Sequence, residues 1–259
     1  MADGSPGTGA YGDEEEAEEY APRLRLSRRG FTVLGVLIAA VLGALSWLVF
    51  FSSVLDVRSV SVQGVRDDRL TADQVRQVLG NLGDGPLARV DLADARRRVE
   101  SIPRVASAEV WRGWPHTLQV KVVQRKPVAA VKGDDGQFTQ MDAGGVSFAT
   151  EATAPAGVPV VELQLSQQAN DAIGVITRQQ LVQGAVAVAA GLPPAVAERA
   201  GAVTVHSYDD IRLQLGGGTT VRWGSPERTD RKAKVLTALL NRKATNYDVS
   251  VPEAPAVSG

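Results

Sequence analysis

The longest apolar stretch in the chain runs from Phe31 to Phe51 and contains no charged residue. A helix of this length rises about 32 Å, which matches the roughly 30 Å hydrocarbon core of a bilayer. The alternative, a buried core helix, would carry a polar face over such a length. The run is longer than the apolar core of a cleaved signal peptide, and no small-residue cleavage site follows it. We therefore predict an uncleaved transmembrane signal anchor over residues 31–51.

Small residues recur at every fourth position on one side of this predicted helix, at Gly35, Ala39 and Gly43. Such spacing lets a second helix approach closely in the membrane. Glycine and alanine are also common in membrane helices in general. A helix-packing face and an ordinary membrane composition therefore both remain open.

The charges that flank the apolar run predict its orientation. Four arginines stand just before it: Arg23, Arg25, Arg28 and Arg29. On the other side only Arg58 lies close, and Asp56 offsets it. Because basic residues are retained on the cytoplasmic side, we expect a cytoplasmic N-terminus and an extracytoplasmic C-terminal part. This arrangement is a single-pass, type II protein of the cell membrane.

Residues 1–30 form a polar segment that combines an acidic run with glycine, proline and serine and has almost no large apolar side chain. Such a composition buries too little surface to offset the entropy of ordering. We expect a disordered cytoplasmic tail, with a docking role for the acidic run as the alternative.

After the apolar run, residues 55–125 alternate between strand and helix periodicity. The pattern predicts, in order, a strand at 57–63, helices at 71–82 and 92–102, and strands at 105–111 and 117–124. The last two strands are joined by a short turn and should form a hairpin. This β-α-α-β-β order is typical of a small α+β layer with both helices on one face of the sheet.

Residues 126–251 read as a second domain that is mainly antiparallel β with flanking helices. Strands are expected at 128–131, 138–141, 146–148, 203–207, 211–215, 219–223 and 246–251, and helices at 178–190 and 226–243. Beyond them, Pro252 and Pro255 predict a flexible C-terminal tail over 252–259.

The amino-acid composition excludes most catalytic and metal-binding functions. The chain has 259 residues, no cysteine, two histidines and a formal net charge of −1. Thiolate metal sites, disulfides and cysteine nucleophiles are thereby excluded, and a nucleic-acid binder would show a basic excess. No nucleophile-elbow or phosphate-loop motif is present. We predict no catalytic, cofactor-binding or metal-binding residue and no small-molecule substrate, so the protein should not be an enzyme.

Several segments, in their order along the chain, resemble the FtsQ/DivIB family of bacterial cell-division proteins. They are VRSVSVQGV at 57–65, the stretch 88–129 with its I-P-x-V and W-P-x-x-L patterns, the hairpin 137–148, the segment 158–161 and the strand 211–216. The resemblance covers about residues 23–251. It implies a POTRA (polypeptide-transport-associated) domain at 55–125, next to the membrane anchor, and the family's β domain at 126–251.

The resemblance implies an essential, non-enzymatic scaffold in septum formation that links early and late division proteins through its extracytoplasmic domains. Its location would be the division septum. The alternative is a membrane-anchored POTRA protein that assists export or envelope-protein assembly. Proteins of that kind usually carry several POTRA repeats or a barrel, whereas this sequence predicts one POTRA domain.

The resemblance also implies a partner and a binding site. The last strand of the family's β domain pairs by β-augmentation with FtsB, which is held in complex with FtsL. The corresponding residues are Tyr247, Asp248, Val249, Ser250 and Val251. Tyr247, Val249 and Val251 should face one way and the other two the opposite way. The alternative is that this strand only closes the sheet.

Overall fold

The computed structural model describes residues 28–66, 69–80, 85–171 and 176–259. Most of the predicted tail 1–30, with Arg23 and Arg25, lies outside the described residues. The chain divides into a unit that ends at Phe51 and a compact unit comprising Ser52–Gly259. The expected α+β class is confirmed.

Helix α1 (Arg28–Phe51) contains the predicted apolar run. Within the described residues it is the one helix long and apolar enough to cross a membrane, and none of its apolar stretch is buried by the chain. Large apolar side chains such as Phe31, Val36 and Trp47 are each more than 60% exposed. That exposure would be costly in water, and it is what a helix surrounded by lipid shows.

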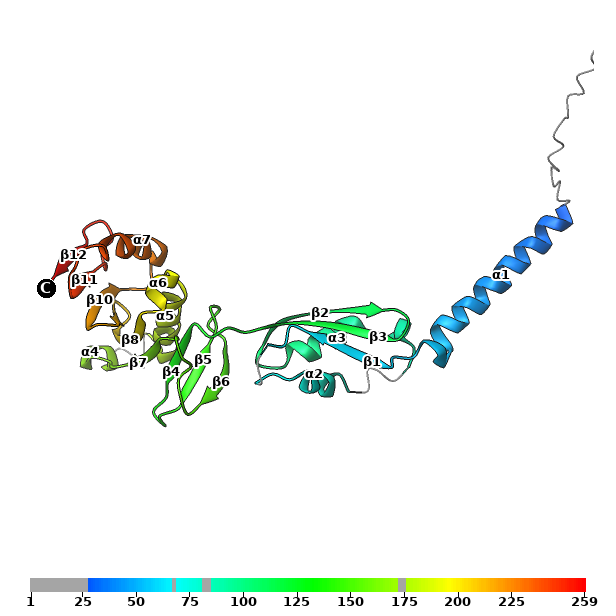
Figure 1. The fold of residues 1–259 in the computed structure, drawn as a ribbon, viewed down its shortest axis with the longest axis horizontal. Helices are drawn as coiled ribbons and strands as arrows, with labels where there is room; N and C mark the ends of the chain where they lie inside the picture. The colour runs from blue at the N-terminus through cyan, green and yellow to red at the C-terminus, as the bar shows by residue number, and fades with distance from the viewer. Residues whose placement is uncertain (1–27, 67–68, 81–84, 172–175) are drawn as a thin grey trace, which may run out of the picture. The chain divides into compact units, whose positions relative to one another are not determined.

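Residues 55–125, which the resemblance predicts to be a POTRA domain, follow the predicted order of elements. The elements of this region are β1 (Ser59–Gln63), α2 (Ala72–Leu79), α3 (Leu92–Glu100), β2 (Val105–Gly113) and β3 (Thr117–Gln124), with short 3-10 turns η1 (Ser53–Leu55) and η3 (Leu87–Arg89). The sheet order is β1-β3-β2 (Figure 1). Strand β1 is parallel to β3, so the helices make the crossover that parallel strands require. Strand β2 pairs with β3 as the predicted hairpin.

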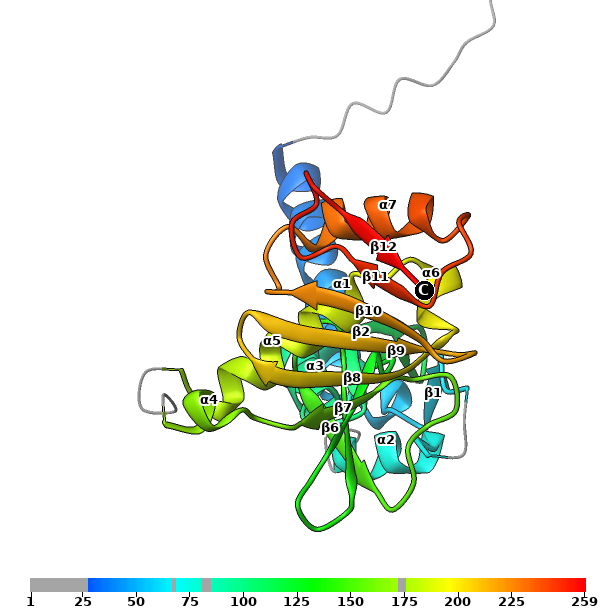
Figure 2. The same ribbon diagram turned by 90° about the vertical axis from the view of Figure 1, so that its left-hand side faces the viewer.

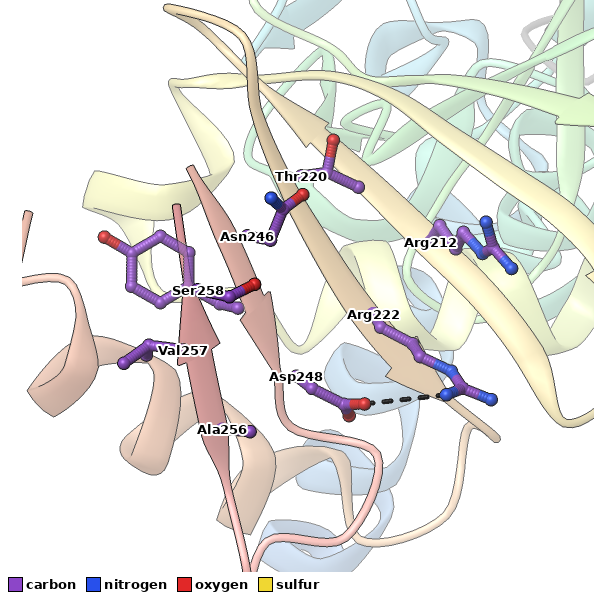
Figure 3. A pocket seen from close by; sticks show the side chains of 9 residues that line it. Arg212, Thr220, Arg222, Asn246, Asp248, Ala256, Val257 and Ser258 are labelled. Atoms are coloured by element: carbon purple, nitrogen blue, oxygen red, sulfur yellow. Dashed lines mark ion pairs between the residues drawn. The ribbon is translucent and has the colours of Figure 1, made fainter. Parts of the chain in front are cut away.

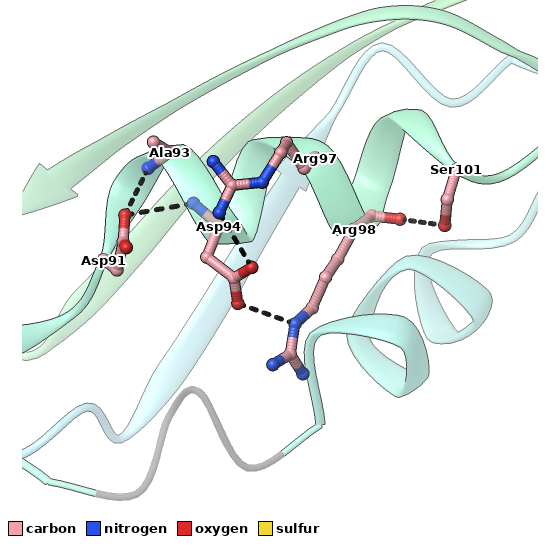
Figure 4. A network of polar contacts seen from close by, with 6 residues as sticks. All are labelled: Asp91, Ala93, Asp94, Arg97, Arg98 and Ser101. Carbon is pink, nitrogen blue, oxygen red and sulfur yellow. Dashed lines mark hydrogen bonds and ion pairs between the residues drawn. The ribbon is translucent and has the colours of Figure 1, made fainter.

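Both POTRA helices begin at side-chain caps that the sequence supplies. Thr71 and Gln74 form a capping box at the start of α2. The carboxylate of Asp91 accepts the backbone N–H groups of Ala93 and Asp94 at the start of α3 (Figure 4). The helices bury one apolar stripe each on the inner face of the sheet, and this cluster includes Val75, Leu79, Ala95, Val99, Leu118 and Val120.

The outer side of α3 carries the arginine run 96–98. Arg97 and Arg98 both pair with Asp94, at 3.1 and 2.8 Å (Figure 4). Arg96 pairs with Glu100 at 2.8 Å. Ion pairs three and four residues apart stabilise a helix surface by a few tenths of a kcal/mol each. This run is therefore a solvated, internally paired helix face.

The second domain contains a nine-stranded mixed sheet in the order β12-β11-β10-β9-β8-β7-β4-β5-β6. The part from β12 to β7 can be followed in Figure 2. Its strands are β4 (Ala129–Lys132), β5 (Phe138–Met141), β6 (Ser147–Glu151), β7 (Val160–Leu163), β8 (Ala200–Ser207), β9 (Asp210–Leu215), β10 (Thr219–Gly224), β11 (Asn246–Asp248) and β12 (Ala256–Ser258). The helices are α4 (Gln167–Asp171), α5 (Arg178–Ala190), α6 (Pro194–Ala197) and α7 (Thr229–Leu239).

The predicted meander is confirmed in β8, β9 and β10, whose neighbouring strands are antiparallel. Helix α5 has the predicted bounds. Its buried residues, among them Leu181, Ala185 and Val188, share one core with the inner face of the meander, where Leu213 and Trp223 are fully buried. The core therefore holds the C-terminal half of the sheet rigid, and the last strands are built onto it.

Candidate partner-binding site

The C-terminal edge of the large sheet is formed by β12. Strand β11 lies between β10, to which it is parallel, and β12, to which it is antiparallel. The prediction that Tyr247–Val251 forms the sheet edge is therefore wrong, because β11 has a neighbour on both sides. The prediction of a flexible tail at 252–259 is also corrected, since Ala256–Ser258 form β12.

Local hydrogen bonds explain the turn between these two strands. The Oδ1 atom of Asp248 accepts the backbone N–H and the hydroxyl of Ser250, at 2.9 and 2.6 Å, and this ends β11. The backbone N–H of Ala254 then donates to the carbonyl of Val251 at 3.0 Å. Pro252 lies in the turn and Pro255 directly precedes β12, so neither removes a hydrogen bond from the strand pair.

The side chains of the predicted partner segment are divided between core and surface. Tyr247 and Val249 are 4% and 0% exposed and belong to the main core. The Tyr247 hydroxyl donates to the carbonyl of Arg242 at 2.6 Å, which fastens β11 to the chain that follows α7. Val251 is 51% exposed, so the expected alternation ends before it. This segment therefore provides the strand to which β12 is paired, and it is not itself the edge of the sheet.

A shallow pocket of about 470 Å³ lies beside β12 on the open face of the sheet (Figure 3). Arg212 on β9 and Arg222 on β10 stand directly opposite each other there. Two positive charges in this position repel. Asp210 compensates for the first through bonds of 2.9 and 2.8 Å to Arg212, and Asp248 lies 3.6 Å from the Arg222 guanidinium.

The same ion pairs determine the electrostatics of the pocket. The hydrogen bond from Arg212 lowers the pKa of Asp210, and burial opposes this only in part. The polar groups of Thr220, Asn246 and Ser258 complete the lining. These groups donate and accept hydrogen bonds beside a sheet edge, an arrangement suited to recognising an extended peptide. They include no nucleophile with an adjacent base.

Other titratable groups have structural partners. The imidazole Nδ1 of His206 lies 2.9 Å from the carbonyl of Gln164. Lys232 is 1% exposed, its ammonium donates to the carbonyl of Ser225 at 2.7 Å, and burial lowers its pKa. Among the described residues, no group of three His, Cys, Asp or Glu could hold a metal ion. Neither Lys232 nor β12 was indicated by the sequence patterns.

The predicted helix-packing face of α1 remains a prediction. A Cβ atom added at Gly35 or Gly43 would meet no atom within 4 Å, so this side of the helix is open in the single chain. Arg28 and Arg29 belong to the first turn of α1.

Comparison with known proteins identifies the two regions that follow α1. Residues 55–125 match the family model "POTRA domain, FtsQ-type", and residues 129–251 match "Cell division protein FtsQ/DivIB, C-terminal". Strand β12 lies beyond the residues that the second model matches.

Among curated proteins, the cell division protein FtsQ of Streptomyces collinus is 40% identical, over 98% of each chain. That of Streptomyces coelicolor is 39% identical, also over 98% of each chain. That of Mycobacteroides abscessus is 35% identical, over 96% of this chain and 76% of the relative.

A solved structure of the major extracytoplasmic domain of the cell division protein DivIB from Geobacillus stearothermophilus is also similar. It is 15% identical with a TM-score of 0.33, and the match covers 50% of this chain and 96% of the other. The assignment rests instead on the family models and the curated relatives. On that basis, the chain belongs to the FtsQ/DivIB family of bacterial cell-division proteins.

Proposed function

We propose that this protein is a non-enzymatic scaffold of the division septum, which links early and late division proteins through its extracytoplasmic domains. Family membership, one candidate membrane helix within the described residues and two regions matched to family domains support the proposal. The chain would lie in the cell membrane with a cytoplasmic N-terminus. Depletion should give filamentous cells that lack septa. Normal septa combined with defective envelope-protein assembly would favour the export role instead.

The partner site that we propose is the free edge of β12. This strand is the last in the sheet order, so one of its sides has no strand beside it in the described structure. A partner strand, expected from FtsB in complex with FtsL, would continue the sheet through main-chain hydrogen bonds. The neighbouring pocket, with Arg212 and Arg222, would receive a polar or acidic side chain of the partner. The position of β12 carries this proposal.

Two variants test the edge. Val257→Pro removes a main-chain donor and disrupts β12, so copurification with the FtsB–FtsL complex should be lost. Val257→Thr keeps a β-branched side chain, so this variant should still copurify with the FtsB–FtsL complex. Unchanged recovery with the proline variant would contradict the site.

A truncation separates the two possible binding strands. Removing residues 253–259 deletes β12 and leaves β11 as the sheet edge. If the partner pairs with β12, the truncated protein loses binding. If the partner instead displaces β12 and pairs with β11 at Tyr247–Val251, truncation keeps or strengthens binding, and the β12 proposal fails.

The proposed orientation can be read with single cysteines because the chain has none of its own. Ser53 is exposed at the start of η1, just after α1. Ser53→Cys should react in intact cells with a maleimide that does not cross membranes, whereas Ser5→Cys should react only after the membrane is opened. The reverse pattern would overturn the orientation.

A further inference from the structure

The β2–β3 turn lies at the end of the POTRA sheet where the chain arrives from α1. The backbone N–H groups of Arg58 and Ser59 both donate to the carbonyl of His116 in this turn, at 2.9 and 3.3 Å. Strands β1 and β3 are parallel and start in register, with Ser59 opposite Thr117. The turn, the start of β1 and the η1 and η3 turns, which the Asp56–Pro86 bridge connects, form one end of the domain, which we call the tip.

The covalent connection keeps the tip close to the end of α1. Six residues separate Phe51 from Arg58, and the seven Cα-to-Cα steps between them span at most about 25 Å when fully extended. The η1 turn at Ser53–Leu55 shortens the connection further, because a 3-10 turn rises only about 2 Å per residue. If α1 spans a membrane, the length of this linker therefore limits the start of β1 to within about 25 Å of the end of the helix.

The tip exposes large apolar side chains. Trp114 in the turn is 54% exposed, and Val54 in η1 is 53% exposed. By contrast, Trp223 in the second domain is fully buried. An indole ring that is left in water this close to a bilayer matches the preference of tryptophan for the membrane–water interface, where its ring is half in an apolar environment and its N–H remains hydrated.

The charge of the tip suits the same surface. Arg58 and Arg89 are exposed there, and the carboxylate of Asp56, two residues before Arg58, offsets part of this positive charge. The guanidinium of Arg112 donates to the carbonyls of Leu87 and Val90 at 2.9 and 2.8 Å, which holds the η3 turn and Arg89 against the end of β2. Basic side chains beside an exposed aromatic ring favour an anionic lipid surface.

We propose that the tip docks, through Val54, Arg58, Arg89 and Trp114, on the anionic headgroup region of the membrane that α1 spans. Trp114 enters the interface, and the two arginines contact lipid phosphates. The POTRA domain then stands on the membrane at a second point in addition to the helix. This inference rests on α1 being a membrane span and is independent of the proposed edge-strand partner.

Tryptophan fluorescence of the full chain in nanodiscs tests the proposal. A Trp47→Phe, Trp111→Phe double variant leaves Trp114 as the one exposed tryptophan. The other remaining tryptophan, Trp223, is buried and contributes a constant background emission. In nanodiscs that contain phosphatidylglycerol, the emission of Trp114 should be blue-shifted, and lipids brominated near the headgroup end of their acyl chains should quench it. The matched Trp47→Phe, Trp114→Phe variant, which reports Trp111 further along β2, should show neither effect.

Charge variants separate lipid docking from other causes. Arg58→Gln and Arg89→Gln should each reduce the docked population about fivefold in anionic nanodiscs. Neither should change it in zwitterionic ones. The proposal is overturned if Trp114 emits like a water-exposed indole and is not quenched by brominated lipid, or if quenching appears only after the FtsB–FtsL complex is added, which would make Trp114 a protein contact.

Discussion

The hydroxyl of Tyr247 offers a quantitative test of how β11 is held in the sheet. Tyr247→Phe removes the 2.6 Å hydrogen bond to the carbonyl of Arg242 and leaves the buried ring in place. The net loss for such a bond is about 1 kcal/mol. In a unit of this size, that loss lowers the melting temperature by about 2–4 °C.

Tyr247→Ala removes the ring as well. The ring is 4% exposed and lies within the main core, so its truncation should cost about 3–5 kcal/mol. This is a large part of the roughly 5–15 kcal/mol by which a typical domain is stable. Because β12 is paired to this residue through Val257, the alanine variant should also weaken the proposed partner edge.

Urea unfolding of residues 52–259, followed by circular dichroism, measures both effects. The dependence of the unfolding free energy on urea should keep its slope while the midpoint moves. Val251→Ala is the matched control, because this side chain is 51% exposed and its loss should change stability by less than about 0.5 kcal/mol. If the phenylalanine variant is as stable as the parent chain, or the alanine variant loses no more than the control, β11 is not anchored as described.

Three further predictions concern the same compact unit. Gly224→Ala should destabilise it by about 1–3 kcal/mol, since Gly224 has φ +77° and an added Cβ would lie 2.8 Å from the Cβ of Ser250; an unfolding midpoint equal to that of the parent would contradict this close approach. Thr177→Ala removes the hydroxyl of the capping box at the start of α5 and should cost about 1 kcal/mol in the same assay, against no change if the cap is unimportant. The bond to Arg212 lowers the pKa of Asp210, so the contribution of this ion pair to stability is present at neutral pH. The contribution is lost as the pH falls below the ordinary pKa of an aspartate and through the lowered pKa of the folded state. Asp210→Asn should therefore show a shallower acid-induced loss of stability, and an unchanged pH profile would refute the pairing.

Much of the architecture follows from local patterns in the sequence. The uncharged run at 31–51 requires an apolar environment whatever the rest of the chain does. Alternation and caps place the POTRA elements, and Thr71 and Asp91 each begin a helix as the sequence predicts. These features depend on residues a few positions apart, so they can be read without knowing the tertiary fold.

Other boundaries depended on contacts that the local pattern does not contain. Helix α7 begins at Thr229 rather than at Pro226, because Arg228 adopts a left-handed conformation with φ 55°. The ammonium of Lys232 and the hydroxyl of Thr229 then bind the carbonyls of Ser225 and Pro226, which hold the preceding loop against the helix. A lysine that is buried in this way resembles any surface lysine in the sequence.

The sequence by itself determined the long apolar helix, the order of the domains and the absence of cysteine chemistry. Only the tertiary structure decided which strand ends the large sheet. A strand as short as Ala256–Ser258 has too few residues to show a period, and it forms because β11, itself held by β10 and by the buried Tyr247, supplies the hydrogen-bond partners. Pairing of this kind depends on residues that are distant in sequence or fixed by the core. The folded sheet therefore decides which strand is the exposed edge, and with it where the proposed binding site lies.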